Sequence, residues 1–163
     1  MILYIVRHGI AIDRADPKSP PEAERPLTAE GVRKTREAAL GFRECGAEPD
    51  ALVTSPYVRA AQTAEIFAEA LGFSVDKIRV SEALKPAENP ADIVKELGHL
   101  RAKEVVLFGH APHVDLLIAH LAGGRAPFTE MKKAGVACFE QTARGKWSLR
   151  WLLTSKLLRK FAD

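Results

Sequence analysis

The sequence predicts an α/β protein, a three-layer sandwich in which helices cover both faces of a mostly parallel central sheet of about five to six strands. Three observations predict this class. Short apolar runs that are typical of strands buried on both faces alternate along the chain with longer helical patterns. Glycine or proline stands at the ends of most of these segments. A length of 163 residues, with 47% apolar and 28% charged side chains, suits one domain over residues 1–163.

The first strand and the first helix are separated by a long loop. Residues 2–6 are all apolar, which predicts a buried strand. Residues 10–26 are rich in aspartate and proline and predict an exposed loop. Thr28 can then cap a helix through about Cys45, and Gly46 is placed to end it.

The middle of the chain repeats the alternation. Residues 51–53 predict a short second strand. Ser55, which is followed by a proline, is expected to be the N-cap of a helix over 55–71. Residues 77–80 are expected to form a third strand, and an Asn-Pro pair begins a helix over 89–97.

The last third of the chain predicts three more strands and one more helix. Residues 105–108 form another apolar run, and a helix is expected over 112–121. The chain then closes with two strands, over 136–141 and 147–153. The basic, partly apolar ending 156–161 is expected to dock on the domain rather than to anchor in a membrane, because a few apolar side chains bind a bilayer weakly.

The composition argues against several classes of partner. A surplus of 24 Lys and Arg over 21 Asp and Glu gives a net charge of only +3, and 7% aromatic residues offer no base-stacking platform, so no nucleic acid is expected. No apolar run approaches the ~18 residues that a membrane span needs. Cys45 and Cys138 cannot form a disulfide framework and favour reduced thiols. The expected location is therefore the cytoplasm, without a membrane partner.

Polar side chains follow the predicted strands where each of them ends. Arg7 and His8 follow the first strand, Arg59 follows the second, and His110 follows the fourth. Ligands of such sheets bind beyond the carboxyl ends of the strands, so we expect these side chains to meet at one rim. Arginine offers a planar fork that matches phosphate oxygens. The pattern therefore predicts a site for a phosphate dianion.

Four blocks of sequence resemble the signature elements of the histidine phosphatase superfamily, whose fold is called phosphoglycerate-mutase-like. They occur in the family order and span residues 1 to about 113. Four ordered blocks are far more specific than one Arg-His-Gly triplet. The blocks are Arg7-His8-Gly9, Arg25-Pro26-Leu27-Thr28-Ala29-Glu30-Gly31, Thr54-Ser55-Pro56-Tyr57-Val58-Arg59-Ala60-Ala61-Gln62-Thr63-Ala64 and Val106-Leu107-Phe108-Gly109-His110.

The resemblance implies that His8 is a nucleophile that is transiently phosphorylated, and that Arg7, Arg59 and His110 bind the phosphoryl oxygens. It also implies that the reaction needs no metal and no cofactor. The chemistry is reasonable, because an imidazole with a pKa of ~6.5 is largely neutral at pH 7 and has a free lone pair. Two arginines and a protonated His110 would offset charge on the equatorial oxygens.

The general acid of the superfamily usually follows the third strand, which points to Glu82, with Glu88 in reserve. The segment around Glu82 does not reproduce the usual acid motif. Because an alkoxide leaves poorly without a proton donor and a phosphoramidate nitrogen leaves more easily, a weak acid favours phosphohistidine as substrate. The short chain and the stretch Leu84-x-Pro86 resemble the short bacterial phosphohistidine phosphatases (the SixA type). The implied partner is a phosphohistidine-bearing protein, or else a small phosphorylated substrate.

Two further interpretations stay open at this point. A mutase or phosphatase for small metabolites would need a working acid at Glu82, and a phosphoresidue-binding module would keep the site without turnover. Cys138 and Arg144 satisfy the Cys-x5-Arg pattern of cysteine-dependent phosphatases. We interpret that match as chance, because the five intervening residues contain no glycine and the segment predicts a strand. His113 is expected to support the site or to lie on the surface.

Overall fold

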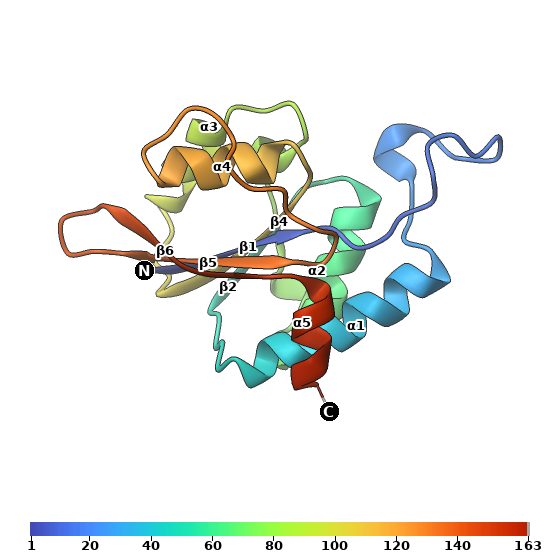
Figure 1. The fold of residues 1–163 in the computed structure, drawn as a ribbon, viewed down its shortest axis with the longest axis horizontal. Helices are drawn as coiled ribbons and strands as arrows, with labels where there is room; N and C mark the ends of the chain where they lie inside the picture. The colour runs from blue at the N-terminus through green and yellow to red at the C-terminus, as the bar shows by residue number, and fades with distance from the viewer. Residues whose placement is uncertain (163) are drawn as a thin grey trace.

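The computed structural model describes residues 1–162, and a six-stranded sheet forms the middle layer of this part of the chain (Figure 1). The strand order is β3-β2-β4-β1-β5-β6. β1 to β4 are parallel, whereas β5 runs antiparallel to both β1 and β6. The strands are β1 (Ile2–Arg7), β2 (Ala51–Thr54), β3 (Arg79–Val80), β4 (Glu104–Gly109), β5 (Val136–Gln141) and β6 (Trp147–Leu153). The mostly parallel sheet is confirmed.

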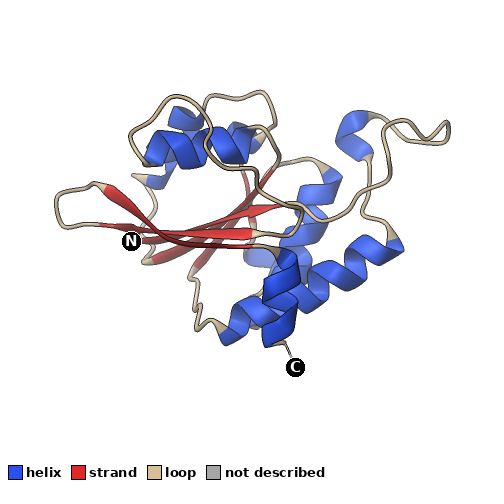
Figure 2. Ribbon diagram, viewed as in Figure 1, coloured by secondary structure: helices blue, strands red, loops and turns tan. Residues whose placement is uncertain are grey.

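Helices cover both faces of this sheet, as Figure 2 shows. Alternation along β1 explains why both faces need covering: Tyr4 and Val6 pack on one side, and Leu3 and Ile5 pack on the other. The first side carries α1 (Ala29–Glu44), α2 (Val58–Leu71) and α5 (Ser155–Leu158), and the second carries α3 (Pro90–Leu97) and α4 (His113–Leu121). The three-layer α/β sandwich is therefore confirmed.

Two of the predicted helix boundaries are confirmed and one is wrong. The Thr28 hydroxyl accepts a hydrogen bond from Gly31 N at the start of α1, and Gly72 ends α2 with a φ of 68°. Ser55, in contrast, does not cap α2, which begins three residues later at Val58. The Ser55 hydroxyl instead accepts a hydrogen bond from Tyr57 N at 3.3 Å and lies 2.8 Å from Nε2 of His110.

The edge strand β3 is shorter than the sequence predicts. Only Arg79 and Val80 pair with β2, while residues Val75–Lys77 form a 3-10 turn. Both strand residues are exposed, so little apolar burial is available to extend the pairing.

The C-terminal segment docks on α1, as the sequence predicts. Leu158 is fully buried in the core, and Arg159 lies 3.4 Å from Glu37 of α1. Gly41 permits this close approach, because a Cβ at that position would lie 1.8 Å from the Leu158 carbonyl oxygen. None of the helices within residues 1–162 is long and apolar enough to cross a membrane.

Candidate active site

The carboxyl ends of β1, β2 and β4 meet at one edge of the sheet and bring the predicted polar residues together. The backbone N–H of His8 donates to the Gly109 carbonyl, and that of Ser55 donates to the Phe108 carbonyl, which fixes the three strand ends side by side. A cavity of about 270 Å³ opens there. It is lined by Arg7, His8, Ala11, Arg14, Glu22, Arg25, Arg59, Pro86, Ala111, Pro112 and Lys133.

His8 lies at the base of the cavity with one ring nitrogen fixed and the other directed at a guanidinium. Its Nδ1 is 2.7 Å from the Gly9 carbonyl oxygen, and a carbonyl only accepts, so Nδ1 carries the proton. Nε2 therefore holds the free lone pair. Burial, with further contributions from Arg59 and Arg7, lowers the pKa of His8 from 6.5 to about 3. The imidazole is thus neutral and nucleophilic at neutral pH.

Arg59 is the second residue of α2 and is 3% exposed. Its Nε donates to Nε2 of His8 at 3.2 Å, and its two terminal nitrogens donate to the backbone and side chain of Glu22 at 2.7 and 2.8 Å. The guanidinium also lies 5.2 Å from the ring centroid of Tyr57. All three nitrogens of the guanidinium are therefore held by hydrogen bonds.

His110 lies beside His8, with a ring centroid 5.2 Å from that of His8. Its Nε2 is 2.8 Å from the Ser55 hydroxyl, and its Nδ1 has no hydrogen-bond partner within residues 1–162. Burial and the charge of Arg59 lower the pKa of His110 to about 2. The ring is therefore neutral in the free protein, and the expected imidazolium requires the negative charge of a bound phosphoryl group to raise that pKa.

Arg7 reaches the cavity from the end of β1. One terminal nitrogen donates to the Met131 carbonyl at 2.6 Å, while the buried Nε has no partner in the part of the chain that the structure describes. The side chain therefore keeps donor capacity for an anion.

Glu22 is a member of the site that the sequence did not predict. Its carboxylate receives two hydrogen bonds from Arg25, at 2.9 and 3.0 Å, and lies 3.2 Å from Arg14 as well as 2.8 Å from Arg59. Hydrogen bonding to Arg25 and the nearby guanidinium charges lower the pKa of Glu22 to about 2. A loop residue such as Glu22 has no periodic pattern that would mark it. The only local signal is the opposite charge of Arg25, three residues later.

Glu82, expected as the general acid, is not brought to the cavity. It begins the 3-10 turn Glu82–Leu84, which buries Ala83 and Leu84 and turns Glu82 outward. Its side chain is 71% exposed and forms an ion pair with Lys85. Glu88 is exposed as well, so neither candidate acid faces His8.

Two motif residues that follow Arg59 hold the surrounding loops. The Thr63 hydroxyl accepts a hydrogen bond from Gly9 N at 3.0 Å, and the side-chain amide oxygen of Gln62 accepts one from Leu27 N at 2.8 Å. Gly31 allows the loop to approach α1, because a Cβ there would lie 2.0 Å from the Ile10 carbonyl oxygen. The motif therefore supplies supports for the site as well as its reacting groups.

The remaining candidates lie apart from this chemistry. Cys138 is buried in β5, and burial raises the pKa of its thiol to about 11, which contradicts a thiolate nucleophile. His113 is fully buried at the start of α4, so of its two expected positions the one on the surface is wrong. Among residues 1–162, no group of three or more His, Cys, Asp or Glu side chains is placed to hold a metal ion.

Comparisons with known proteins agree with this geometry. Residues 3–88 match the family described as histidine phosphatase superfamily (branch 1). An uncharacterized protein of Picosynechococcus sp. (strain ATCC 27264 / PCC 7002 / PR-6) is 36% identical over 83% of this chain and 82% of its own. Phosphohistidine phosphatase SixA of Escherichia coli (strain K12) is 28% identical over 94% of both chains. A structure of the protein histidine phosphatase SixA complexed with tungstate superposes with a TM-score of 0.83 at 24% identity, covering 97% of this chain and 99% of that one.

Proposed function

The chain belongs to the histidine phosphatase superfamily (branch 1) and is a histidine-nucleophile phosphatase, and from this premise we propose that it removes phosphate from phosphohistidine in signalling phosphotransfer proteins. His8 is the proposed nucleophile. Arg7, Arg59 and His110 are the proposed ligands of the phosphoryl oxygens.

One observation carries the choice of substrate: the cavity offers no carboxylic acid. Among residues 1–162, Glu22 is the only carboxylate that lines it, and with a pKa of about 2 this group is ionised and has no proton to give. Glu82 faces solvent. An alkyl phosphate needs a proton on its leaving oxygen, whereas a phosphoimidazole whose second nitrogen is protonated leaves as a neutral imidazole. The substrate then brings its own proton.

The first step transfers the phosphoryl group to the enzyme. The lone pair on His8 Nε2 attacks phosphorus, and the bond between phosphorus and the substrate nitrogen breaks, with its electron pair staying on the substrate ring. Because Nδ1 of His8 is hydrogen-bonded to Gly9, the ring is held in the tautomer that this attack requires.

The second step returns the phosphoryl group to water. A water molecule attacks phosphorus, and the bond to His8 Nε2 breaks with its electron pair returning to the ring. Inorganic phosphate leaves, and the proton lost by the water goes to solvent or stays on the phosphate. Arg7 and Arg59 supply positive charge to the oxygens in both steps. Bound phosphate raises the pKa of His110, which lets this ring donate as well.

The comparisons support the same substrate. The relative from Escherichia coli is named a phosphohistidine phosphatase, and the aligned region covers 94% of each chain. Cys45 and Cys138 are both free in the described chain, which suits the cytoplasmic location expected from the sequence.

The test is phosphate release from a phosphohistidine protein in excess EDTA, measured beside 3-phosphoglycerate and fructose 2,6-bisphosphate, with wild type and His8→Ala. We expect release from phosphohistidine, lost in the variant. Activity chiefly on the two metabolites would move the function to carbon metabolism and overturn the proposed substrate. Binding without release from any of the three would favour the phosphoresidue-binding module.

A further inference from the structure

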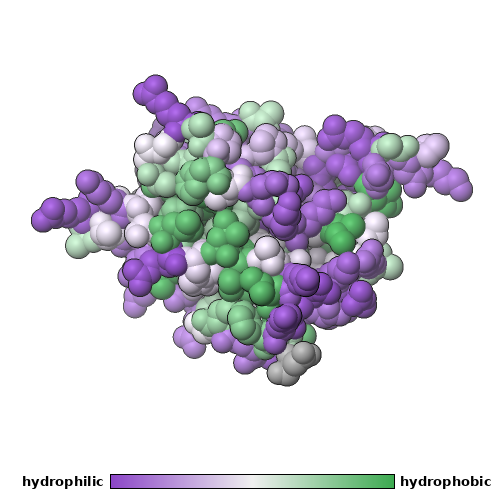
Figure 3. Space-filling view, in the orientation of Figure 1, coloured by the Kyte–Doolittle hydropathy of each residue, from purple (hydrophilic) through white to green (hydrophobic). Residues whose placement is uncertain are grey.

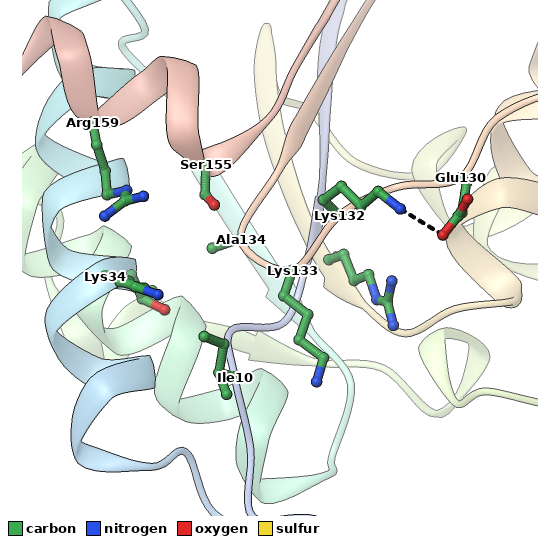
Figure 4. Close-up of a pocket in the computed structure, with 10 residues that line it drawn as sticks. Ile10, Lys34, Glu130, Lys132, Lys133, Ala134, Ser155 and Arg159 are labelled. Carbon is green, nitrogen blue, oxygen red and sulfur yellow. Dashed lines mark hydrogen bonds and ion pairs between the residues drawn. The ribbon is translucent and has the colours of Figure 1, made fainter.

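We propose that a second cavity beside the catalytic one binds carboxylate side chains of the phosphorylated protein, so that acidic residues near the phosphohistidine select the substrate. This inference rests on the proposed function. The second cavity, which we call the basic cavity, has a volume of about 380 Å³ (Figure 4). It is lined by Arg7, Ile10, Lys34, Thr35, Glu130, Lys132, Lys133, Ala134, Ser155 and Arg159.

Three separate parts of the fold build this cavity. Lys34 comes from α1, Arg159 from the turn after α5, and Lys132 and Lys133 from the segment before β5, with Lys132 turned toward Glu130 (Figure 4). Figure 3 shows that hydrophilic residues dominate the end of the molecule that carries the loop between β1 and α1, whereas apolar residues gather over β6 and α4. The basic cavity therefore depends on the docking of the C-terminal segment on α1, and it is not the surface of a single helix.

The charge inside the basic cavity is strongly unbalanced. Five cationic side chains line it, against one carboxylate, Glu130, which lies 2.6 Å from Lys132. Lys34 pairs with Glu30, and Arg159 lies 3.4 Å from Glu37, but neither of these carboxylates lines the cavity. Lys133 has no ion pair within residues 1–162, and burial together with the charge of Arg7 lowers its pKa. An anionic ligand would relieve this repulsion.

Unpartnered hydrogen-bonding atoms point to the same conclusion. Arg7 Nε, Thr35 Oγ1 and Arg159 Nε are buried without a partner in the described part of the chain, and all three residues line the basic cavity. Two of these atoms can only donate, and the hydroxyl can donate as well. Buried donors without acceptors are costly, so the walls of this cavity hold uncompensated donors in addition to a surplus of positive charge.

The basic cavity lies next to the catalytic cavity, because Arg7 and Lys133 line both. One ligand can therefore place a phosphoryl group at His8 and a second anion in the basic cavity. Four of the five cations that line the catalytic cavity are arginines, whose planar forks match phosphate. Three of the five that line the basic cavity are lysines, which are point charges that bind carboxylates in several geometries. An acidic protein surface fits this second set better than a second phosphate.

The experiment compares a small and a large substrate. The double variant Lys34→Ala/Lys132→Ala is assayed with phosphoramidate, which fills only the catalytic cavity, and with a phosphohistidine protein that has aspartate or glutamate around the phosphorylated residue. Lys146→Ala is the matched control, because it removes a lysine from the hairpin between β5 and β6, at the other end of the sheet. Melting temperatures verify that all variants fold.

We expect the double variant to raise KM for the phosphoprotein by about tenfold, with kcat and all constants for phosphoramidate unchanged, because complementary charges govern encounter and docking. Added salt should raise the wild-type KM for the protein substrate more than the KM for phosphoramidate. If the double variant matches Lys146→Ala on both substrates, the inference is overturned while the proposed function stands. If wild type ignores the phosphoprotein but hydrolyses fructose 2,6-bisphosphate with a KM that rises in the double variant, the proposed function fails and the occupant is a second phosphate.

Discussion

The guanidinium of Arg59 donates a hydrogen bond to Nε2 of His8 across 3.2 Å, and so occupies the lone pair that attacks phosphorus in the proposed reaction. In the free protein the nucleophile is held by the same residue that is proposed to bind its target. A phosphoryl oxygen that replaces this contact would accept the hydrogen bond from Arg59 Nε, and the lone pair of His8 Nε2 would be released. In the proposed reaction phosphorus must therefore lie close to Nε2 of His8 while one of its oxygens contacts Nε of Arg59.

Arg59→Ala is expected to lower kcat for a phosphohistidine protein by ~10²–10³-fold, by analogy with loss of one preorganised donor. Arg59→Lys should not restore activity, because an ammonium does not reproduce the planar guanidinium whose three nitrogens donate to His8 and to the backbone and side chain of Glu22. Steady-state kinetics on both variants check this, with Arg33→Ala on the exposed side of α1 as control. Near-normal turnover in Arg59→Ala would contradict the assigned role.

The protonation of His8 gives a second prediction. Burial holds the pKa of the folded imidazole at about 3, so the ring stays neutral as the pH falls from 8 to 5 and takes up a proton only as it approaches 3. NMR spectra of protein labelled with ¹⁵N at histidine should therefore show no titration of the His8 ring over that range, with His8→Ala identifying its signals. A midpoint near 6.5 for His8 would be inconsistent with a buried nucleophile.

Glu22→Gln tests the carboxylate that competes with phosphate for the guanidinium groups. The substitution keeps the shape and removes a negative charge that lies 2.8 Å from Arg59. We expect the inhibition constant of inorganic phosphate to fall by about three- to tenfold, because the cavity becomes more positive. Glu24→Gln, one exposed position of the same 3-10 turn, is the control. A weaker affinity for phosphate in Glu22→Gln would show that orientation of Arg59 outweighs charge.

Glu82→Gln is expected to leave activity within about twofold of wild type on phosphohistidine protein and on alkyl phosphates alike, as for most surface substitutions. The reason is the position of Glu82, which is exposed and paired with Lys85 rather than directed at His8. Parallel assays on phosphoramidate and 3-phosphoglycerate check this. Loss of activity on the alkyl phosphate alone would restore Glu82 as general acid and favour the small-metabolite function.

The sheet and most of the helices could be predicted because their signals are local. The apolar run at 2–6 and the caps at Thr28 and Gly72 depend on neighbours within a few residues, and the structure confirms them. The same holds for the convergence of Arg7, Arg59 and His110, because parallel strands end at one edge.

The parts that sequence reasoning missed depend on contacts between distant segments. Glu22 belongs to the site only because its loop folds back over Arg59, 37 residues further on. Ser55 leaves its expected cap to pair with His110, 55 residues away. The basic cavity needs Arg159 beside Lys34, which follows from the docking of the C-terminal turn on α1. No local pattern encodes such pairings.

Three buried histidines should make the protein sensitive to mild acid. The pKa values of His8, His110 and His113 are all lowered, chiefly by burial. Above pH 6.5 both the folded and the unfolded states are neutral at these rings. As the pH falls below 6.5, only the unfolded state takes up protons, so the free energy of unfolding decreases until the folded pKa is reached.

His113→Leu separates this effect from catalysis. Both ring nitrogens of His113 are buried without a partner within residues 1–162, so the apolar replacement should not lower the free energy of unfolding at pH 7. Between pH 6.5 and 5 its decline should be shallower than that of wild type by about 1.4 kcal/mol per pH unit at most, the limit for one proton. Urea unfolding at several pH values measures both curves, with His120→Leu at an exposed position as control. Parallel wild-type and His113→Leu curves would mean that His113 is protonated in the folded protein, which its burial argues against.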